Sequence, residues 1–120
     1  MEKESVDLRN LLMKINEQKQ TNANLALEFD CIVETEDIKP LIKVINYAIN
    51  YTSQLTDQQI QISLNASMSG ITIGITAFME SPELPAINPQ VNEALEYYNA
   101  GVKQKGEAGK YTQLLISFNK

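Results

Sequence analysis

The sequence contains no histidine, no tryptophan and a single cysteine among its 120 residues. Without an imidazole, the protein lacks the side chain that most often serves as a general base, a metal ligand or a phosphate carrier. A serine nucleophile would have to rely on a lysine as its base. One cysteine cannot close an internal disulfide. These absences exclude many familiar catalytic and metal-binding arrangements.

Positive charge is also scarce, since 10 Lys and Arg residues stand against 15 Asp and Glu residues, for a net charge of −5. Nucleic-acid binding requires clustered positive charge, so we expect no nucleic-acid partner. No apolar run approaches the roughly 20 residues of a membrane span. Residues 1–7, which read M-E-K-E-S-V-D, lack the basic segment and apolar run of a signal peptide. We therefore expect a cytoplasmic protein that makes no membrane contact.

Hydrophobic residues make up 43% of the chain, which is enough for one domain with a buried core. The first amphipathic segment lies within residues 7–20, with Ser5 or Asp7 as its N-terminal cap. Its apolar residues recur at the spacing of one helical face. They are Leu8, Leu11, Leu12 and Ile15.

Two further segments carry helical periodicity. Residues 37–52 form the most regular one, with a proline in the first turn and Thr35 or Asp37 as the cap. Its apolar positions follow the 3.6-residue period for four turns. Residues 89–100 form the other, which opens with Pro89 after Asn88 as the cap, a favourable pair at the start of a helix.

Three segments alternate apolar and polar residues and predict strands at 25–29, 59–66 and 71–77. Residues 111–118, with apolar residues at 114, 115, 116 and 118, predict a closing strand. The strands at 59–66 and 71–77 are joined by a short turn that contains Gly70, which predicts a hairpin. Residues 80–89 hold three of the four prolines and predict a loop, and the polar residues 103–110 predict another.

The resulting order is α-β-α-β-β-α-β. It predicts an α+β fold, a two-layer sandwich with a mixed or mainly antiparallel sheet and helices on one face. We divide the chain into an N-terminal amphipathic helix, residues 1–20, and a single α+β domain, residues 21–120.

The end of the second predicted helix resembles a known pattern. Residues 47–52 read Y-A-I-N-Y-T. They resemble the end of the N-box helix in the ATPase domains of histidine kinases and their relatives (the GHKL, or Bergerat, family), which reads N-A-I-K-Y-T. From Asn24 to Asn119, the predicted elements also follow the family's order of strand, N-box helix, hairpin, lid, helix and closing strand. The resemblance implies the family's fold.

The sequence departs from the family where the family binds its nucleotide. The N-box asparagine, which helps to hold the magnesium ion on the ATP phosphates, is replaced by Tyr47. A polar or acidic ligand one turn earlier is replaced by Lys43, which cannot coordinate a cation. An alternative register uses Asn46 and Asn50, which lie four residues apart on one helix face. That register moves Lys43 and Tyr47 to apolar family positions and spoils the periodicity.

Two other family motifs are missing. Residues 77–82 read A-F-M-E-S-P where the family has an Asp-x-Gly-x-Gly box whose aspartate binds the adenine amine. The glycine-rich segment that wraps the phosphates should precede the last helix, and a short proline-rich loop stands there instead. The resemblance therefore implies a degenerate ATPase domain. A phosphotransferase on this scaffold needs a phospho-accepting histidine, which the sequence excludes.

We predict a non-catalytic domain, with no cofactor or metal ion, that acts as a protein-interaction or signalling adaptor module. The alternative is a small-molecule binder that reuses the vestigial cleft. The candidate cleft residues for that alternative are Lys43, Asn46, Tyr47 and Asn50. The carboxylates of Glu34, Glu36 and Asp37 are interpreted as partners of a helix start rather than as metal ligands.

The first helix is the candidate interaction helix. In the family, a helix ahead of the first strand corresponds to the end of a dimerising stalk. The stripe of Leu8, Leu11, Leu12 and Ile15 therefore packs on the protein's own sheet or pairs with a second copy in a homodimer. A stable coiled coil needs about three or four heptads, so this short stripe favours packing on the domain.

Overall fold

The computed structural model describes residues 3–19, 22–56, 58–68, 70–78, 87–107 and 109–119. Within them the elements follow the chain in this order: β1 (Glu4–Asp7), α1 (Leu8–Lys19), β2 (Ala23–Leu27), β3 (Ile32–Thr35), α2 (Lys39–Gln54), β4 (Ile60–Ser67), β5 (Gly70–Phe78), α3 (Gln90–Glu96), β6 (Ala100–Glu107) and β7 (Tyr111–Asn119). Among the described helices, none is long and apolar enough to cross a membrane.

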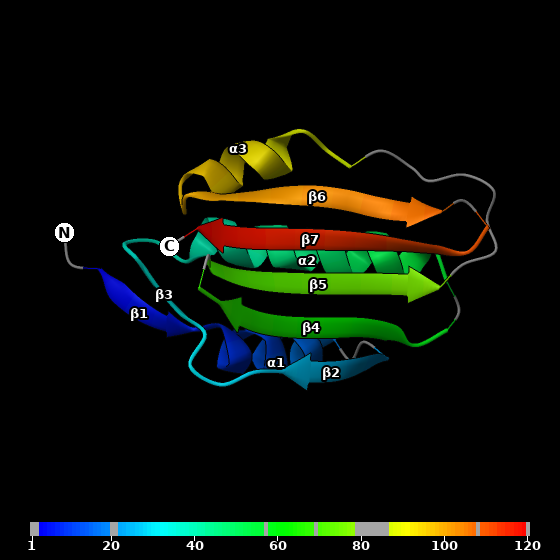
Figure 1. Cartoon of the computed structure of the whole chain (residues 1–120), viewed down its shortest axis with the longest axis horizontal. Coiled ribbons are helices and arrows are strands. Elements are labelled where there is room, and N and C mark those ends of the chain that lie inside the picture. The colour runs from blue at the N-terminus through cyan, green and yellow to red at the C-terminus, as the bar shows by residue number, and fades with distance from the viewer. Residues whose placement is uncertain are drawn as a thin grey trace.

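A five-stranded sheet forms one layer of the molecule, with the strand order β2-β4-β5-β7-β6. β2 pairs parallel with β4, and the other neighbours pair antiparallel. Figure 1 shows α1 and α2 behind this sheet and α3 beside β6. β1 and β3 form a separate antiparallel pair. The predicted α+β sandwich with a mixed sheet and helices on one side is confirmed.

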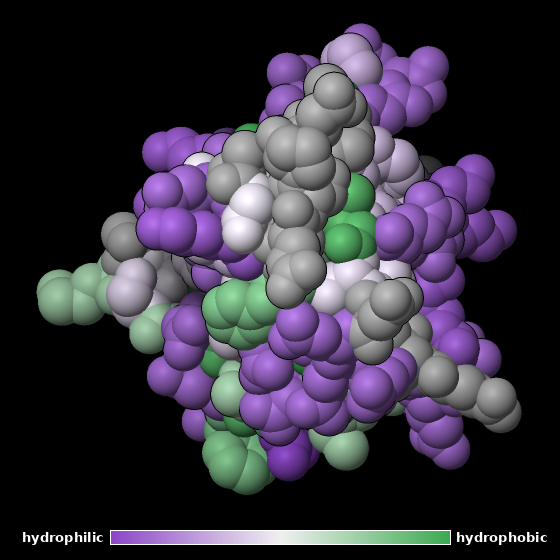
Figure 2. Space-filling model, turned by 90° about the vertical axis from the view of Figure 1, so that its right-hand side faces the viewer, coloured by the Kyte–Doolittle hydropathy of each residue, from purple (hydrophilic) through white to green (hydrophobic). Residues whose placement is uncertain are grey.

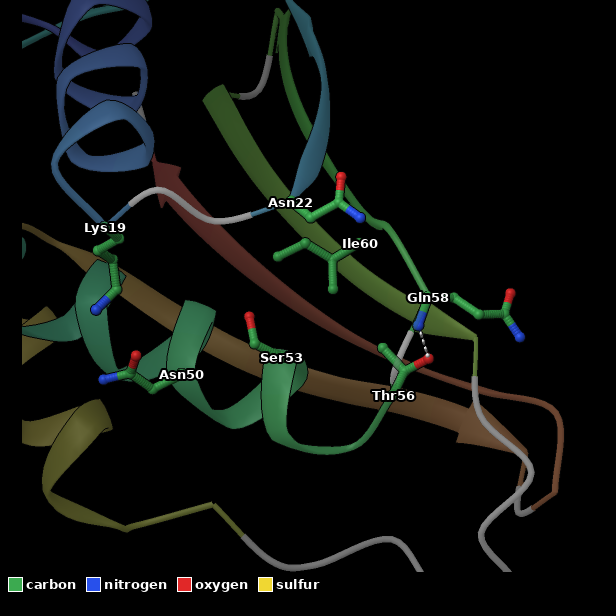
Figure 3. A pocket seen from close by; sticks show the side chains of 7 residues that line it. All are labelled: Lys19, Asn22, Asn50, Ser53, Thr56, Gln58 and Ile60. Carbon is green, nitrogen blue, oxygen red and sulfur yellow. Dashed lines mark hydrogen bonds between the residues drawn. The ribbon is translucent and has the colours of Figure 1, made fainter.

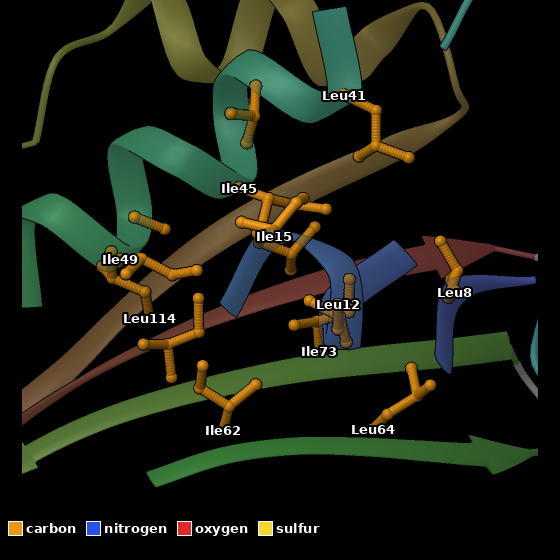
Figure 4. Packing of buried hydrophobic residues seen from close by; sticks show 14 of the residues in the cluster. Leu8, Leu12, Ile15, Leu41, Ile45, Ile49, Ile62, Leu64, Ile73 and Leu114 are labelled. Atoms are coloured by element: carbon orange, nitrogen blue, oxygen red, sulfur yellow. The ribbon is translucent and has the colours of Figure 1, made fainter. Parts of the chain in front are cut away.

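The core lies between the sheet and the two longer helices. Alternate residues of β4, β5 and β7 point toward the helices and are buried, as strand geometry requires. Figure 4 shows the side chains of α1 and α2 meeting them. The side chains that are buried to the last few per cent include Leu12, Leu41, Ile45, Ile49, Ile62, Leu64, Ile73, Ile75, Leu114 and Ile116.

Helix α1 belongs to this core. Asp7 caps the helix, because its carboxylate accepts hydrogen bonds from the backbone N–H of Arg9 at 2.9 Å and of Asn10 at 3.4 Å. The side chains of Leu8, Leu12 and Ile15 are buried against the protein's own sheet, and Leu11 is partly buried. The sequence allowed this helix either to pack on the protein's own sheet or to pair with a second copy. In the structure it packs on the sheet. Leu8, Leu12 and Ile15 present no exposed stripe to a second copy.

Helix α2 starts later than predicted. It begins at Lys39 after Ile38, which makes no side-chain capping bond. The predicted caps lie in the turn before it: Thr35 Oγ1 accepts from the backbone N–H of Asp37 at 3.2 Å, and Asp37 Oδ1 accepts from that of Lys39 at 3.0 Å. Helix α3 is shorter than the predicted segment 89–100, because it ends at Glu96 and Ala100 already belongs to β6. Its N-cap position is Pro89, one residue after the predicted cap, and Asn88 Oδ1 accepts from the backbone N–H of Gln90 at 3.0 Å.

The hairpin of β4 and β5 is confirmed, and Gly70, the first residue of β5, allows β7 to lie close beside it. Gly70 has a φ of 153°, and a Cβ there would lie 2.0 Å from the backbone oxygen of Phe118. A larger residue would therefore displace the start of β5 from the end of β7.

Three strands differ from the prediction. The predicted loop at 103–110 is wrong over most of its length, because β6 continues to Glu107 in register with β7. β6 is an edge strand with polar residues on its exposed side, so its sequence lacks a clear alternation. β1 and β3 are four residues each, too short to show a period. Residues 80–86 of the predicted proline-rich loop lie outside the described residues.

We predict that Ile45→Ala lowers the free energy of unfolding by about 2–5 kcal/mol, because the side chain is fully buried and its loss leaves a cavity. Urea denaturation followed by circular dichroism measures this. Asn50→Ala, at an exposed position of the same helix, is the control and should change stability by no more than about 0.5 kcal/mol. Equal losses of stability in the two variants would show that the apolar face of α2 does not form the core.

Candidate functional site

A cavity of about 290 Å³ lies between α2 and α3 and is the place to look for the vestigial cleft. We call it the α2–α3 cavity. Its described lining comes from one face of α2 and from the start of α3. The lining residues are Pro40, Lys43, Val44, Tyr47, Asn88, Gln90, Val91 and Ala94.

Tyr47 spans this cavity from α2 toward α3. Its hydroxyl accepts a hydrogen bond from the backbone N–H of Asn88 at 2.8 Å. One turn along α2, the ring of Tyr51 stacks on it, with centroids 6.3 Å apart and planes 29° apart. The Tyr47 side chain is thus held by a hydrogen bond at its hydroxyl and by packing of its ring against Tyr51.

Two more tyrosines join α2 to its neighbours. The side-chain amide of Gln104 on β6 donates to the Tyr51 hydroxyl at 2.5 Å. The Tyr98 hydroxyl donates to the backbone oxygen of Asp37 at 2.6 Å and accepts from the backbone N–H of Leu41 at 3.0 Å. We call Tyr47, Tyr51 and Tyr98 the tyrosine seam. Their hydroxyl groups form hydrogen bonds that join α2, or the turn before it, to the residues around α3 and to β6.

The seam also changes the acidity of two of its members. Partial burial raises the pKa of the Tyr98 phenol, and the nearby Asp37 carboxylate raises it further, although the bond from Leu41 opposes them. Burial likewise raises the pKa of Tyr51, against a lowering by its bond from Gln104. Both groups are therefore held more firmly in their neutral, hydrogen-bonding form.

The four cleft candidates do not form one site. Lys43, whose side chain is exposed, and Tyr47 line the α2–α3 cavity. Asn46 instead donates its side-chain amide to the backbone oxygen of Ile42, within its own helix, at 3.0 Å. Asn50 is exposed and lines a different cavity. The described lining of the α2–α3 cavity thus includes the residues of the favoured N-box register and neither asparagine of the alternative one.

The cavity beside Asn50 has a volume of about 410 Å³ and is polar. Figure 3 shows its side chains, which come from the end of α1, the last turns of α2 and the start of β4. Ser53 Oγ is buried and has no hydrogen-bond partner among the described residues. The described lining consists of Lys19, Asn22, Asn50, Ser53, Thr56, Gln58 and Ile60. Such a set can hydrogen-bond a small polar molecule, and no periodic pattern in the chain indicates that these residues meet.

The end of β5 is where the family places its adenine-binding aspartate. Here Ala77 is fully buried and Phe78 is half exposed, so neither position offers a carboxylate. Met79 to Pro82, the rest of that stretch, lie outside the described residues. Figure 2 shows this end of the molecule, where hydrophilic residues dominate and hydrophobic ones form small separate patches.

The acidic residues before α2 were the other candidates for chemistry, as possible metal ligands. Among the described residues, no three side chains of His, Cys, Asp or Glu are placed to share a metal ion. Glu34, Glu36 and Asp37 are all exposed, and the Asp37 carboxylate is used in the turn that leads into α2.

Tyr98 is the residue that sequence reasoning undervalued. It is half-buried, and its hydroxyl holds the start of α2. The available signal was its spacing from Val91 and Leu95, which would place all three on one face of the predicted last helix, although Tyr98 lies just after the end of α3. No sequence pattern shows that this face meets the N-terminus of a helix 57 positions earlier.

We predict that Tyr98→Phe lowers the free energy of unfolding by about 1–3 kcal/mol, because it leaves the backbone N–H of Leu41 without its partner. Chemical denaturation at pH 7 measures the loss. The matched control is Tyr97→Phe, since the neighbouring Tyr97 is exposed. If both variants are as stable as the wild type, the hydroxyl of Tyr98 contributes nothing to the fold.

We also predict that stability falls as the pH rises above about 10, the ordinary pKa of tyrosine. The unfolded chain releases these phenolic protons from that pH upward, whereas the folded state retains them because burial raises the pKa of Tyr98 and Tyr51. The unfolded state then binds fewer protons than the folded state, so the free energy of unfolding decreases through this range. Denaturation curves from pH 9 to 11 should show a shallower decline for Tyr98→Phe. A decline as steep as that of the wild type would contradict the prediction.

No family model matches the sequence, and a search of curated proteins found no match either. Solved structures do match, among them two histidine kinases and one ATP-binding domain. The Acinetobacter baumannii histidine kinase AdeS has a TM-score of 0.72 and 15% sequence identity, over 99% of this chain and 68% of that one. The histidine kinase domain of the E. coli osmosensor EnvZ has a TM-score of 0.75 and 9% identity, over 99% and 89% of the two chains.

The third example is the ATP-binding domain of PrrB from Mycobacterium tuberculosis, with a TM-score of 0.73 and 14% identity over 99% of this chain and 98% of that one. At such identities the similarity establishes the fold and leaves the activity open. The chain has, over nearly its whole length, the fold of histidine kinase ATP-binding domains, as the N-box resemblance implied.

Proposed function

We propose that this protein is a non-catalytic domain with the histidine kinase ATPase fold, which acts through contact with another protein as an interaction or signalling adaptor module. The helices and strands of the scaffold are retained, while the polar groups that the resembling family uses for its nucleotide are replaced. A scaffold that has lost its chemistry still presents folded surfaces, and a fold does not impose one function.

The observation that carries the proposal is the placement of Tyr47. In the resembling family this position holds the asparagine that binds magnesium. Here a phenol ring occupies the α2–α3 cavity, and its hydroxyl is bonded to the backbone N–H of Asn88. Phosphates and a hydrated metal ion would need this space, and a phenol is a poor ligand for magnesium compared with carboxylate and amide oxygens.

A second observation supports the same conclusion at the other end of the expected nucleotide site. Ala77 and Phe78 stand at the end of β5 in place of an adenine-binding carboxylate. A charged hydrogen bond contributes about 1.5–3 kcal/mol, so its loss alone weakens binding about ten-fold or more. Loss of the metal ligand adds to this, to the extent that the two effects are independent.

The signalling part of the proposal rests on the proteins that share this fold. AdeS and EnvZ are histidine kinases, and a degenerate relative of their domains fits a role beside such proteins in the cytoplasm. The lack of histidine means that this chain would not carry a phosphohistidine itself. Its contribution would therefore be binding rather than group transfer.

The alternative function is the binding of a small molecule in the remaining cavity. The α2–α3 cavity supports it, since its volume of about 290 Å³ is near the lower end of the range of about 300–1,000 Å³ for ligand sites. Lys43 and Tyr47 would supply the polar contacts and Val44 and Val91 the apolar ones. Asn46 and Asn50 would not take part, because neither belongs to the described lining.

We predict that the protein shows no saturable binding of ATP with magnesium below about 100 μM in isothermal titration calorimetry, since a site that has lost its metal ligand and adenine contact falls toward millimolar affinity. Tyr47→Asn, which restores the residue type of the family, should not by itself restore binding. A thermal-shift titration checks the same result by a second readout.

Tyr97→Ala is the control, because Tyr97 is exposed and outside the described lining of the cavity. Saturable binding of ATP by the wild type that is lost in Tyr47→Ala and kept in Tyr97→Ala would show a working nucleotide site. That result would overturn the proposed function.

A further inference from the structure

One end of the sheet carries large apolar side chains that are exposed to solvent. Figure 1 shows β3, the start of β5 and the end of β7 meeting there, at the end where both chain termini are labelled. Ile32 on β3 is 49% exposed, Tyr97 after α3 is 55% exposed, and Met68 in the turn before β5 is 99% exposed. We call these three residues the end patch. Large apolar side chains that gather on one part of a surface are typical of an interaction site.

A hollow lies beside the end patch. A cavity of about 270 Å³ opens between β3, β5, β7 and the turn after α3. Ile32 lines it directly, and Tyr97 packs edge to face on Tyr98, which also lines it, at a centroid distance of 5.0 Å. Met68 stands three positions before Ile71, another lining residue. The volume is below the usual range for a drug-sized ligand, and the accessible lining is more polar than apolar, so the cavity suits an inserted polar or basic side chain.

Negative charge borders the same hollow. Glu34 lines the cavity, and the exposed Glu36 and Asp37 follow it along the chain. The field of the Asp37 carboxylate reaches Tyr98, whose pKa it helps to raise. None of these three carboxylates forms an ion pair within the described part of the chain. They therefore remain available to a cation from outside.

We propose that the end patch binds a basic amphipathic helix of a partner protein, with apolar side chains against Ile32, Met68 and Tyr97 and Lys or Arg side chains facing Glu34 and Glu36 at the cavity. This inference rests on the proposed protein-binding function and names the surface and the kind of partner. The apolar groups come from three separate elements, so the partner must present several side chains on one face, as the i, i+3, i+4 anchors of a helix do. An extended strand would instead add its backbone to a free edge, such as that of β3, which pairs only with β1 among the described strands.

The charge distribution also selects the partner. A second copy of this chain, which carries a net charge of −5, would bring the same carboxylates together across a two-fold axis. Like charges placed opposite each other in an interface are unfavourable, and opposite charges speed association and orient the partner. An acidic or self-associating partner therefore fits this surface less well than a basic one.

The probe for the test is a synthetic helical peptide of about 18 residues, built from leucine at i, i+3, i+4 and i+7 spacing with lysine elsewhere. Its matched control has glutamate in place of every lysine. Fluorescence anisotropy with the full chain should show saturable binding of the Leu/Lys peptide, weaker at high salt, and no binding of the Leu/Glu peptide.

Substitutions then locate the site. Ile32→Ser should weaken binding of the Leu/Lys peptide by about five-fold or more, because it removes an apolar wall of the cavity. Phe78→Ser is the matched control, since Phe78 is 47% exposed on the opposite end of the sheet, and it should leave binding unchanged. Glu34→Gln with Glu36→Gln should reduce both affinity and salt dependence, whereas Glu17→Gln on α1 should alter neither. Circular dichroism confirms that each variant is folded.

Four results would overturn the proposal: no binding of the Leu/Lys peptide, equal binding of the Leu/Glu peptide, equal loss in Phe78→Ser, or a wild-type dimer in sedimentation that Ile32→Ser dissolves. The last result would identify a second copy as the occupant. Each is separate from the ATP titration, which decides whether the domain is non-catalytic. A chain that binds neither ATP nor peptide would keep the non-catalytic assignment and lose this surface.

Discussion

The burial of one face of α2 against β5 and β7 is the interaction on which the rest of the structure depends. Leu41, Ile45 and Ile49 lie one turn apart on that face and are almost completely removed from water. Removal of apolar surface from water is the main favourable term in folding, and each such side chain contributes about 1.5–3 kcal/mol. With this face committed to the sheet, the two flanks of α2 are left for α1 on one side and α3 on the other.

The contacts on the two flanks of α2 determine which kind of site can form beside this helix. On the side of α3 and β6, the tyrosine seam fills and bridges the space, with Tyr47, Tyr51 and Tyr98 each bonded across it. A tyrosine supplies a large apolar body together with one polar tip, so it can pack along a helix and still satisfy a distant backbone group. The region that serves nucleotide chemistry in the resembling family is used here to hold the layers together, which is why we favour a binding role.

Surface features of the two ends of the sheet point the same way. The end at which β5 and β6 finish is mostly hydrophilic, whereas the opposite end combines Ile32, Met68 and Tyr97 with carboxylates that have no described ion-pair partner. Exposed apolar groups that gather on one part of a surface mark contact sites, and exposed carboxylates without a described partner can pair with a basic protein. The scaffold thus separates its stabilising interactions, which lie around α2, from its candidate contact surface at one end.

Much of this was readable from the sequence, because a helix or strand with one buried face repeats its apolar residues at 3.6 or 2 positions. That period determined α2, the hairpin of β4 and β5, the strand β7 and hence the α+β class, and the Y-A-I-N-Y-T stretch indicated the family of folds. Tertiary structure alone decided β6, whose polar edge is paired by the backbone of β7. It also decided the separation of Asn50 from Tyr47 and the bond between Tyr98 and the start of α2. Local periodicity indicates which face of a helix or strand is buried, whereas contacts between elements far apart in the chain depend on how those buried faces pack together.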